Sequence, residues 1–425
     1  MTAEVAILNK HGIALAADSA VTTGDLKIFN TVNKVFALNK TQPVGIMVYN
    51  AADIMGVPVE TVIKEFRRKC CPKTCEHLEG YAEAFEAFLK ADTSLFSEEA
   101  RTGSLSAIAE SLVQQMREEA CWKLNAAGWK GWGHPSAGEA KRALTGTIAE
   151  HERRIEKTAA IQVDEQPEKE RLVAAEVGSR LDEQIRLLGQ LFSLDAPLET
   201  RICSLILKHF FSEAKCGGET GFVIAGFGTK DVFPRLRAFE FQCSALRLHK
   251  MVSRYSIDIS DQIISQIHPF GQKDVMATFV EGIDPVYKLF LSEFISNYFR
   301  QKGKELKSGI PPRPTEARLF SAIGTELARE FARGLDELVW AQFVQPTVHV
   351  VASMPKEELA ILAEALINLT ALKRKASRDA ETVGGPTDVA VISKGDGLIW
   401  IKRKHYFDSE LNPLFAQRWL QDNDS

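Results

Sequence analysis

The sequence predicts an α+β fold in which two layers of β-sheet are covered by helices and interrupted by large helical insertions. Strand-like apolar runs occupy the first 50 residues and return near residues 221 and 389. Helical apolar spacing fills the stretches between them, and the strand pattern is absent from about residue 76 to 217. Because strands and helices come in separate blocks, two sheets packed face to face with helices outside would bury both kinds of element.

The chain opens with a predicted β-hairpin. Apolar runs within residues 4–17 flank the segment 9–12, Asn-Lys-His-Gly, whose residue types suit a tight turn. Further strands are predicted at 34–38 and 44–49, and helical spacing begins at Val59. The first part of the chain therefore supplies strands and then a helix.

The stretch after these elements is predicted to be a helical insertion. Residues 139–186 carry 9 basic and 11 acidic side chains in mixed order. Such mixing is typical of a solvated helix face rather than of a binding patch. Pro167 marks a predicted break between two of its helices.

The rest of the chain repeats the order of strands and then helices. Strands are predicted at 221–228, 237–241, 254–259, 263–268, 389–392 and 398–402. Helices are predicted from about 275 toward 300, at 315–342 and at 359–378. We therefore divide the chain into five parts. They are a first core part (1–90), a helical insertion (91–217), core strands with a helix (218–301), a second helical insertion (302–350), and a last core part with a tail (351–425).

Composition excludes several classes of function. Lys and Arg number 52 against 56 Asp and Glu, so there is no basic field to attract nucleic acid. The apolar runs are far shorter than the roughly 20 residues of a membrane-spanning helix. The start of the chain lacks the basic and apolar regions of an export signal, and seven cysteines indicate free thiols. We expect a cytoplasmic protein without a nucleic-acid or membrane partner.

The amino terminus offers a candidate nucleophile. Met1 precedes the small residue Thr2, so removal of the methionine would place a free α-amine beside the Thr2 hydroxyl. The ordinary pKa of an α-amine, about 7.7 to 8.0, leaves a neutral fraction near pH 7 that can accept a proton. Threonine with its own amine is a recognised nucleophile and base pair, although many chains begin with these two residues.

The pattern that follows Thr2 resembles the opening of proteasome β-subunits and their bacterial relatives. The matching segments are 2–7, 12–19, Lys34-Val35-Phe36 and Ala51-Ala52-Asp53. Those proteins are N-terminal-nucleophile (Ntn) hydrolases, and the resemblance implies a four-layer αββα sandwich. It also implies that Thr2, Asp18 and Lys34 form the catalytic set.

Physical reasoning agrees with this set. A lysine beside the threonine hydroxyl favours the alkoxide, and a carboxylate keeps that lysine charged and oriented. The alternative is that Asp18 closes a turn and Lys34 faces solvent. No metal and no organic cofactor is needed.

The carboxyl-terminal part also resembles the family, with departures. Asp379 and Thr382 keep the family spacing of an acid and a hydroxyl that support the amine, but Val383 is an extra residue before the Gly pair. Tyr49 replaces the glycine whose backbone N–H binds the oxyanion, and a backbone donor survives that change. Gln272 stands where the family has a serine before its central helix.

The register of the resemblance assigns a substrate pocket as well. The assigned residues are small or apolar, which favours a small or apolar substrate side chain, and the alternative is that they only fill the core. They are Val21, Val32, Met47 and Ala51.

The resemblance predicts a threonine-type hydrolase of peptide or amide bonds that works through an acyl-Thr intermediate. It further implies ring-like homo-oligomers and an ATP-dependent unfoldase partner. Two alternatives stay open, namely a small-molecule amidase or acylase on the same fold, and a catalytically idle ring-assembly or scaffold subunit. A cluster made of Cys70, Cys71, Cys75 and His77 suggests zinc, but no second pair follows at finger spacing, so we predict no metal site.

Overall fold

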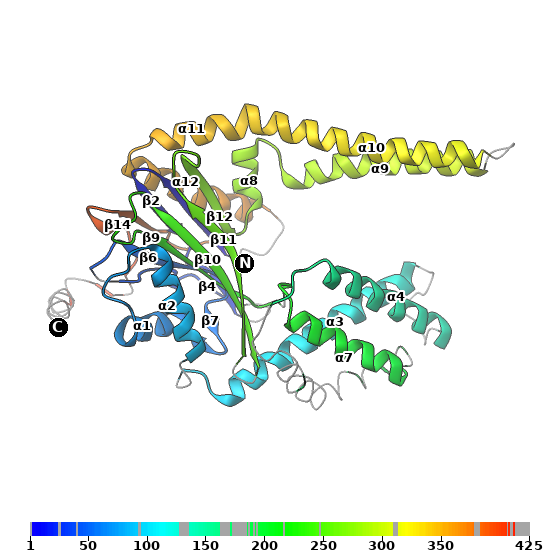
Figure 1. Cartoon of the computed structure of the whole chain (residues 1–425), viewed down its shortest axis with the longest axis horizontal. Coiled ribbons are helices and arrows are strands. Elements are labelled where there is room, and N and C mark those ends of the chain that lie inside the picture. The colour runs from blue at the N-terminus through cyan, green and yellow to red at the C-terminus, as the bar shows by residue number, and fades with distance from the viewer. Residues whose placement is uncertain are drawn as a thin grey trace.

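Two five-stranded antiparallel sheets form the centre of the molecule in the computed structural model (Figure 1). The structure describes residues 2–412 apart from 24–26, 40, 92–94, 127–135, 162–170, 172–184, 186–187, 190–191, 193, 216, 246–247, 309–312, 378–382, 406 and 409–410. The protein therefore has a mixed α+β fold, as the sequence predicts.

The first sheet contains both ends of the predicted core. Its strand order is β12-β1-β2-β13-β14. The bounds are Ala3–Asn9 (β1), Gly12–Ala17 (β2), Ser265–Gly271 (β12), Asp388–Ser393 (β13) and Gly397–Lys402 (β14). The hairpin predicted at the start of the chain is β1–β2, in which Glu4 pairs with Ala17 and Asn9 with Gly12.

The second sheet lies against the first and has the order β11-β10-β9-β6-β5. Its bounds are Val35–Ala37 (β5), Val44–Asn50 (β6), Thr220–Gly226 (β9), Arg235–Ala245 (β10) and Leu248–Asp258 (β11). Two short ribbons are Val21–Thr23 (β3) with Lys27–Phe29 (β4), and Asp53–Ile54 (β7) with Val57–Pro58 (β8).

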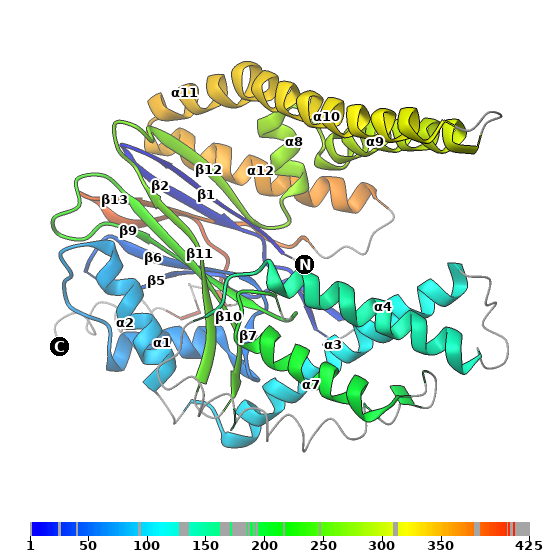
Figure 2. The same ribbon diagram turned by 45° about the vertical axis from the view of Figure 1, so that its right-hand side comes forward.

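Helices cover the outer faces of the two sheets. The helices that do so are Val59–Lys69 (α1), Leu78–Ala91 (α2), Asp274–Glu281 (α8), Gln345–Ser353 (α11) and Lys356–Ala376 (α12). Alternate residues of β1 and β2 pack against α12, and α1 and α2 cover the second sheet (Figure 2). A third cluster, which includes Ala6, Leu8 and Leu15, fills the space between the sheets. The period-two alternation of β1 thus directs Thr2 and Glu4 toward the second sheet.

The predicted first insertion is helical where the structure describes it. Its helices are Glu98–Ala126 (α3), Ala137–Glu156 (α4) and Ala196–Phe210 (α7). They bury an apolar core of their own that includes Met116, Leu144 and Ile202. Helix α4 begins at a capping box, in which the Ser136 hydroxyl accepts from the Glu139 N–H and donates to its carboxylate.

The second insertion begins earlier than the sequence suggests. Helices Pro285–Ser308 (α9) and Pro314–Val339 (α10) form a long antiparallel hairpin that extends away from the sheets, followed by the π-helical turn Trp340–Val344 (η1) (Figure 1). The expected boundary at 301/302 falls inside α9. The helix expected to run from about 275 toward 300 is instead broken, because Gly282 adopts a positive φ of 70° and ends α8. Within the described residues, no helix combines the length and apolarity needed to cross a membrane.

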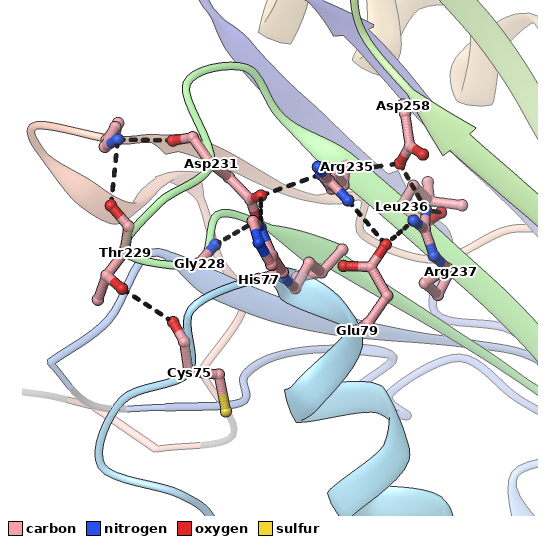
Figure 3. Close-up of polar contacts among 12 residues, drawn as sticks. Cys75, His77, Glu79, Gly228, Thr229, Asp231, Arg235, Leu236, Arg237 and Asp258 are labelled. Carbon is pink, nitrogen blue, oxygen red and sulfur yellow. Dashed lines mark hydrogen bonds and ion pairs between the residues drawn. The ribbon is translucent and has the colours of Figure 1, made fainter.

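A polar network joins α2 to the loop between β9 and β10 (Figure 3). Asp231 accepts from the backbone N–H groups of Gly228 at 2.7 Å and Leu78 at 2.9 Å. Its Oδ1 also lies 2.7 Å from His77 Nδ1 and 3.0 Å from Arg235 Nε. Because Leu78 is the first residue of α2, this buried carboxylate caps the helix from a distant segment and fixes it to the second sheet.

Candidate active site

Thr2 lies at the amino end of β1, on the side that faces the second sheet. Its side chain is almost fully buried, and its carbonyl accepts a hydrogen bond of 2.8 Å from the Gln272 N–H. Its hydroxyl donates to Glu4 Oε2 at 3.0 Å and accepts from the Asn50 N–H at 3.0 Å. The Thr2 oxygen therefore has an acidic group on one side and a backbone donor on the other.

Three buried ionisable side chains form a series of contacts that starts at this hydroxyl. Lys34 Nζ is 3.1 Å from Glu4 Oε1 and forms a short ion pair with Asp18 Oδ1. Asp18 also accepts from the backbone N–H groups of Ala3 at 3.2 Å and Gly384 at 3.0 Å. Thr2 is thereby linked to Lys34 and Asp18 through Glu4, a residue that the sequence interpretation left out.

The Glu4 side chain can be either neutral or ionised near neutral pH. Burial raises its pKa from 4.5 to about 7, the Lys34 ammonium opposes this rise, and the nearby Asp18 carboxylate adds to it. A carboxyl group with such a pKa can both accept and release a proton near neutral pH.

The backbone donor beside Thr2 belongs to Asn50 rather than to Tyr49, the residue expected from the sequence. Asn50 has a positive φ of 66°, and Tyr49 is paired with Gly221 in the β6–β9 ladder. The Tyr49 ring packs 5.1 Å from that of Phe270, and its hydroxyl donates to Glu240 at 3.3 Å. Burial raises the pKa of Tyr49 far above its ordinary value, so its hydroxyl stays protonated.

A cavity of about 260 Å³ opens next to these groups. Three of the four expected pocket residues line it, namely Val21, Val32 and Ala51. The fourth, Met47, lies in the core between the sheets and does not contribute to the lining. Lys34, Tyr49 and Asn50 also belong to the wall, so the cavity adjoins the residues that surround Thr2.

The expected supporting residues have different positions. The Gln272 side chain accepts a hydrogen bond from Arg374 on α12, and its backbone N–H holds the Thr2 carbonyl. Asp379 and Thr382 lie outside the described residues.

No model of a known protein family matches the chain, and no curated protein matches it. Among solved structures, the chain is similar to a Gly-1 mutant of Anbu from Hyphomicrobium sp. strain MC1, with 11% identity and a TM-score of 0.31 over 100% of this chain and 97% of that one. It is also similar to Anbu, an ancestral β-subunit, from Yersinia bercovieri, with 10% identity and a TM-score of 0.30 over 100% of this chain and 96% of that one. Both resemblances are distant, and neither assigns an activity to this chain.

The sequence interpretation missed two members of the site, Glu4 and Asn50. Glu4 had a visible signal, because a charged residue two positions after Thr2 shares its strand face within an otherwise apolar run. Asn50 had none, because the direction of its N–H depends on the positive φ at the end of β6.

The described residues contain no group of three or more His, Cys, Asp or Glu side chains that could hold a metal ion. Cys70, Cys71 and Cys75 are free thiols, and His77 contacts Asp231 in the network of Figure 3. Burial raises the pKa of Cys71 to about 11, which keeps its thiol protonated at neutral pH. The cysteine-rich segment thus belongs to the packing around α2.

Gly271 is a sensitive position beside the site. Its φ is +65°, and a Cβ added there would lie 2.2 Å from the Thr2 carbonyl oxygen and 2.8 Å from Glu4 Oε2. We expect Gly271→Ala to lower the free energy of unfolding by about 1–3 kcal/mol, because both the strain and the overlap displace Thr2.

Gly395→Ala is the matched control for this substitution, since a Cβ at Gly395 has no neighbour within 4 Å among the described residues. Denaturant unfolding should leave this control within about 0.5 kcal/mol of the wild type. Equal stability of the two variants would contradict the close approach of Gly271 to Thr2.

Proposed function

We propose that the protein is an Ntn hydrolase of the αββα type that cleaves amide or peptide bonds through an acyl ester on Thr2. The observation that carries the proposal is the position of the Thr2 hydroxyl between the Asn50 N–H and the Glu4 carboxyl group, each at 3.0 Å. The neighbouring cavity and the buried Lys34 and Asp18 give further support.

In the proposed reaction, Thr2 Oγ1 attacks the carbonyl carbon of the substrate. The hydroxyl proton passes to Glu4 as the new C–O bond forms, and the electron pair of the C=O bond becomes an oxyanion. Collapse of this intermediate breaks the C–N bond, and the departing amine takes the proton from Glu4. Water then attacks the ester with Glu4 again as base, which releases the acid and restores Thr2.

The α-amine that would be exposed by removal of Met1 is the alternative base, and it is the one that the sequence first suggested. Glu4 is favoured because it already holds the Thr2 hydroxyl and because its pKa of about 7 suits proton transfer near neutral pH. The two bases differ in their pH dependence, which makes them separable by experiment.

Lys34, Asp18 and Asn50 stabilise charge in this scheme. The Asn50 N–H donates to Thr2 Oγ1, so it stabilises the partial negative charge that develops on the attacking oxygen as its proton leaves. The Lys34 ammonium lies between Glu4 and Asp18, so it balances one carboxylate as the other gains or loses a proton.

The size of the cavity bears on the substrate. A volume of about 260 Å³ with a mostly apolar lining accommodates a single small or apolar side chain or a short acyl group. This observation also favours the second candidate, a small-molecule amidase or acylase with the same nucleophile. The proposed ring-like homo-oligomer and ATP-dependent unfoldase partner belong to the peptidase alternative.

We expect Thr2→Ala to lower hydrolysis by at least about 10³-fold, because the nucleophilic oxygen is removed. Hydrolysis rates would be measured on two panels, one of short peptide amides and one of small acyl amides. The panel that the wild type hydrolyses faster would distinguish a peptidase from an amidase. Thr315→Ala, at an exposed position at the start of α10, is the control and should keep the wild-type rate. A wild-type protein without activity on either panel would favour the idle subunit.

A further inference from the structure

The α9–α10 hairpin, residues 285–339, is held together by small residues. A Cβ added to Gly324 would lie 2.1 Å from Cβ of Phe299, and one added to Gly303 would lie 2.9 Å from the Ala317 carbonyl oxygen. The two helices therefore approach closely along this seam. Phe299 packs into this seam and is half-buried, but most of the other large apolar side chains of the two helices are exposed.

These exposed side chains form stripes along both helices. On α9, Phe290, Phe294 and Tyr298 follow one another with ring centroids 6.0 and 6.5 Å apart. On α10, exposed apolar residues recur every three or four positions, so that they share one face of the helix. They are Phe320, Ile323, Leu327 and Phe331.

The open apolar area matches what a stable protein interface needs. Six aromatic side chains of the hairpin are each 36–67% exposed. At roughly 200 Å² per ring, they leave about 600 Å² open before the aliphatic side chains are added, and each partner in a standard interface contributes about 800 Å². The six are Tyr287, Phe290, Phe294, Tyr298, Phe320 and Phe331.

Charge is distributed unevenly along the hairpin. The half near its tip, residues 297–325, carries six Lys or Arg and two Glu, a net charge of +4. The half near the sheets, residues 285–296 and 326–339, carries three Lys or Arg and five Asp or Glu, a net charge of −2. Each end is thus complementary to the opposite end of an identical hairpin and repels the same end.

We propose that the hairpin is an interface with a second copy of this chain, in which two hairpins pack antiparallel around a two-fold axis. This arrangement buries the apolar stripes in a four-helix unit and sets each positive tip against a negative base. Helix α10 has 26 residues and is therefore about 39 Å long, which leaves room for the sheet cores at opposite ends. A lipid surface is the less suitable occupant, because the negative half would be repelled by anionic lipids.

The mass of the full chain in solution tests the pairing. By light scattering after size exclusion, we expect the wild type at twice the chain mass or a larger even multiple. Phe290→Glu with Phe294→Glu should reduce this mass by at least half, and unchanged circular dichroism would show that the fold persists. Trp122→Glu, at an exposed position on α3, is the control and should keep the wild-type mass.

Charge reversal tests the orientation. Changing Arg300, Lys302, Lys304 and Lys307 to Glu changes the net charge of the tip from +4 to −4, so that both ends are negative, and we expect the dissociation constant to rise by about tenfold or more. Replacing Glu293, Glu326, Glu330 and Glu337 by Lys in the same variant makes the base positive and should restore pairing. A wild-type monomer, a Phe290→Glu/Phe294→Glu variant with the wild-type mass, or a tip reversal without effect would overturn the proposal. Binding of a monomeric wild type to phosphatidylserine vesicles would also overturn it and would assign the surface to lipid.

Discussion

Replacing Lys34 by methionine is expected to lower the free energy of unfolding by about 3–5 kcal/mol and to abolish acylation of Thr2. Lys34 is buried between Glu4 and Asp18, and both carboxyl groups are buried as well. Methionine fills a similar volume but leaves two acidic groups without the cation between them. Breaking a buried ion pair on one side is costly because the remaining charge has no water to solvate it.

The loss should depend on pH in a defined direction. The pKa of Glu4 is raised by burial to about 7, so Glu4 is neutral at pH 4 and the missing cation then matters less. The destabilisation by Lys34→Met should therefore be larger at pH 8 than at pH 4, as measured by denaturant unfolding at both values.

Lys230→Met provides the control, because Lys230 pairs with Glu76 at the exposed surface. An exposed pair contributes at most about 1 kcal/mol, so this variant should resemble the wild type. If Lys34→Met were no less stable than Lys230→Met, the proposed electrostatic balance around Thr2 would be wrong.

Replacing Glu4 by glutamine is expected to remove the pH dependence of Thr2 acylation around pH 7. In the wild type, acylation should rise as the pH increases through about 7, because only the ionised Glu4 can accept the hydroxyl proton. Glutamine keeps the shape and the contact to Thr2 but cannot take up the proton. The acylation rate of Glu4→Gln should be nearly independent of pH across this range. It should lie roughly 10²–10⁴-fold below the wild-type rate at the plateau.

The same substitution should lower the acylation rate at high pH but should raise the stability of the fold relative to the wild type there. The folded-state pKa of Glu4 lies above its ordinary 4.5, so folding favours the protonated form. The stability contributed by Glu4 is complete below about 4.5 and is lost as the pH rises through about 7. Glu4→Gln should therefore be more stable relative to the wild type at pH 8 than at pH 4.

Glu316→Gln, at an exposed position on α10, is the control for both measurements and should follow the wild type. A Glu4→Gln variant with the wild-type pH profile would identify the α-amine of Thr2 as the base instead. Chemical acetylation of that amine would then remove the activity.

Much of the core was predictable because its elements follow simple patterns. The two apolar runs within residues 4–17 and the turn residues between them predict the opening hairpin, which the structure contains as β1 and β2. The site was predictable in part. The predicted residues Lys34 and Asp18 form a buried ion pair, and their catalytic role stays a prediction, whereas Asn50 reaches Thr2 through a local backbone conformation that residue types do not reveal.

The hairpin shows a second limit of sequence patterns. Apolar residues at helical spacing in α9 and α10 normally indicate a face buried in the same chain. Here Gly303 and Gly324 bring the two helices close together, Phe299 packs against Gly324, and most of the other large apolar residues are exposed. Spacing alone cannot tell whether a stripe packs within the chain or against another one. The break at Gly282 was also missed, although the sequence Glu281-Gly282-Ile283-Asp284-Pro285 that follows the apolar run contains a glycine and a proline, which commonly end a helix.

The most direct test of the central claim is to identify the atom that reacts with a threonine-directed covalent inhibitor. Intact mass of the purified chain, before and after incubation, would be followed by peptide mapping of the amino-terminal fragment. We predict a chain without Met1 that gains one inhibitor adduct on Thr2, no adduct in Thr2→Ala, and slower labelling in Glu4→Gln. A folded chain that retains Met1 and stays unlabelled, or that carries the adduct at another residue, would contradict the assignment of Thr2 as the nucleophile.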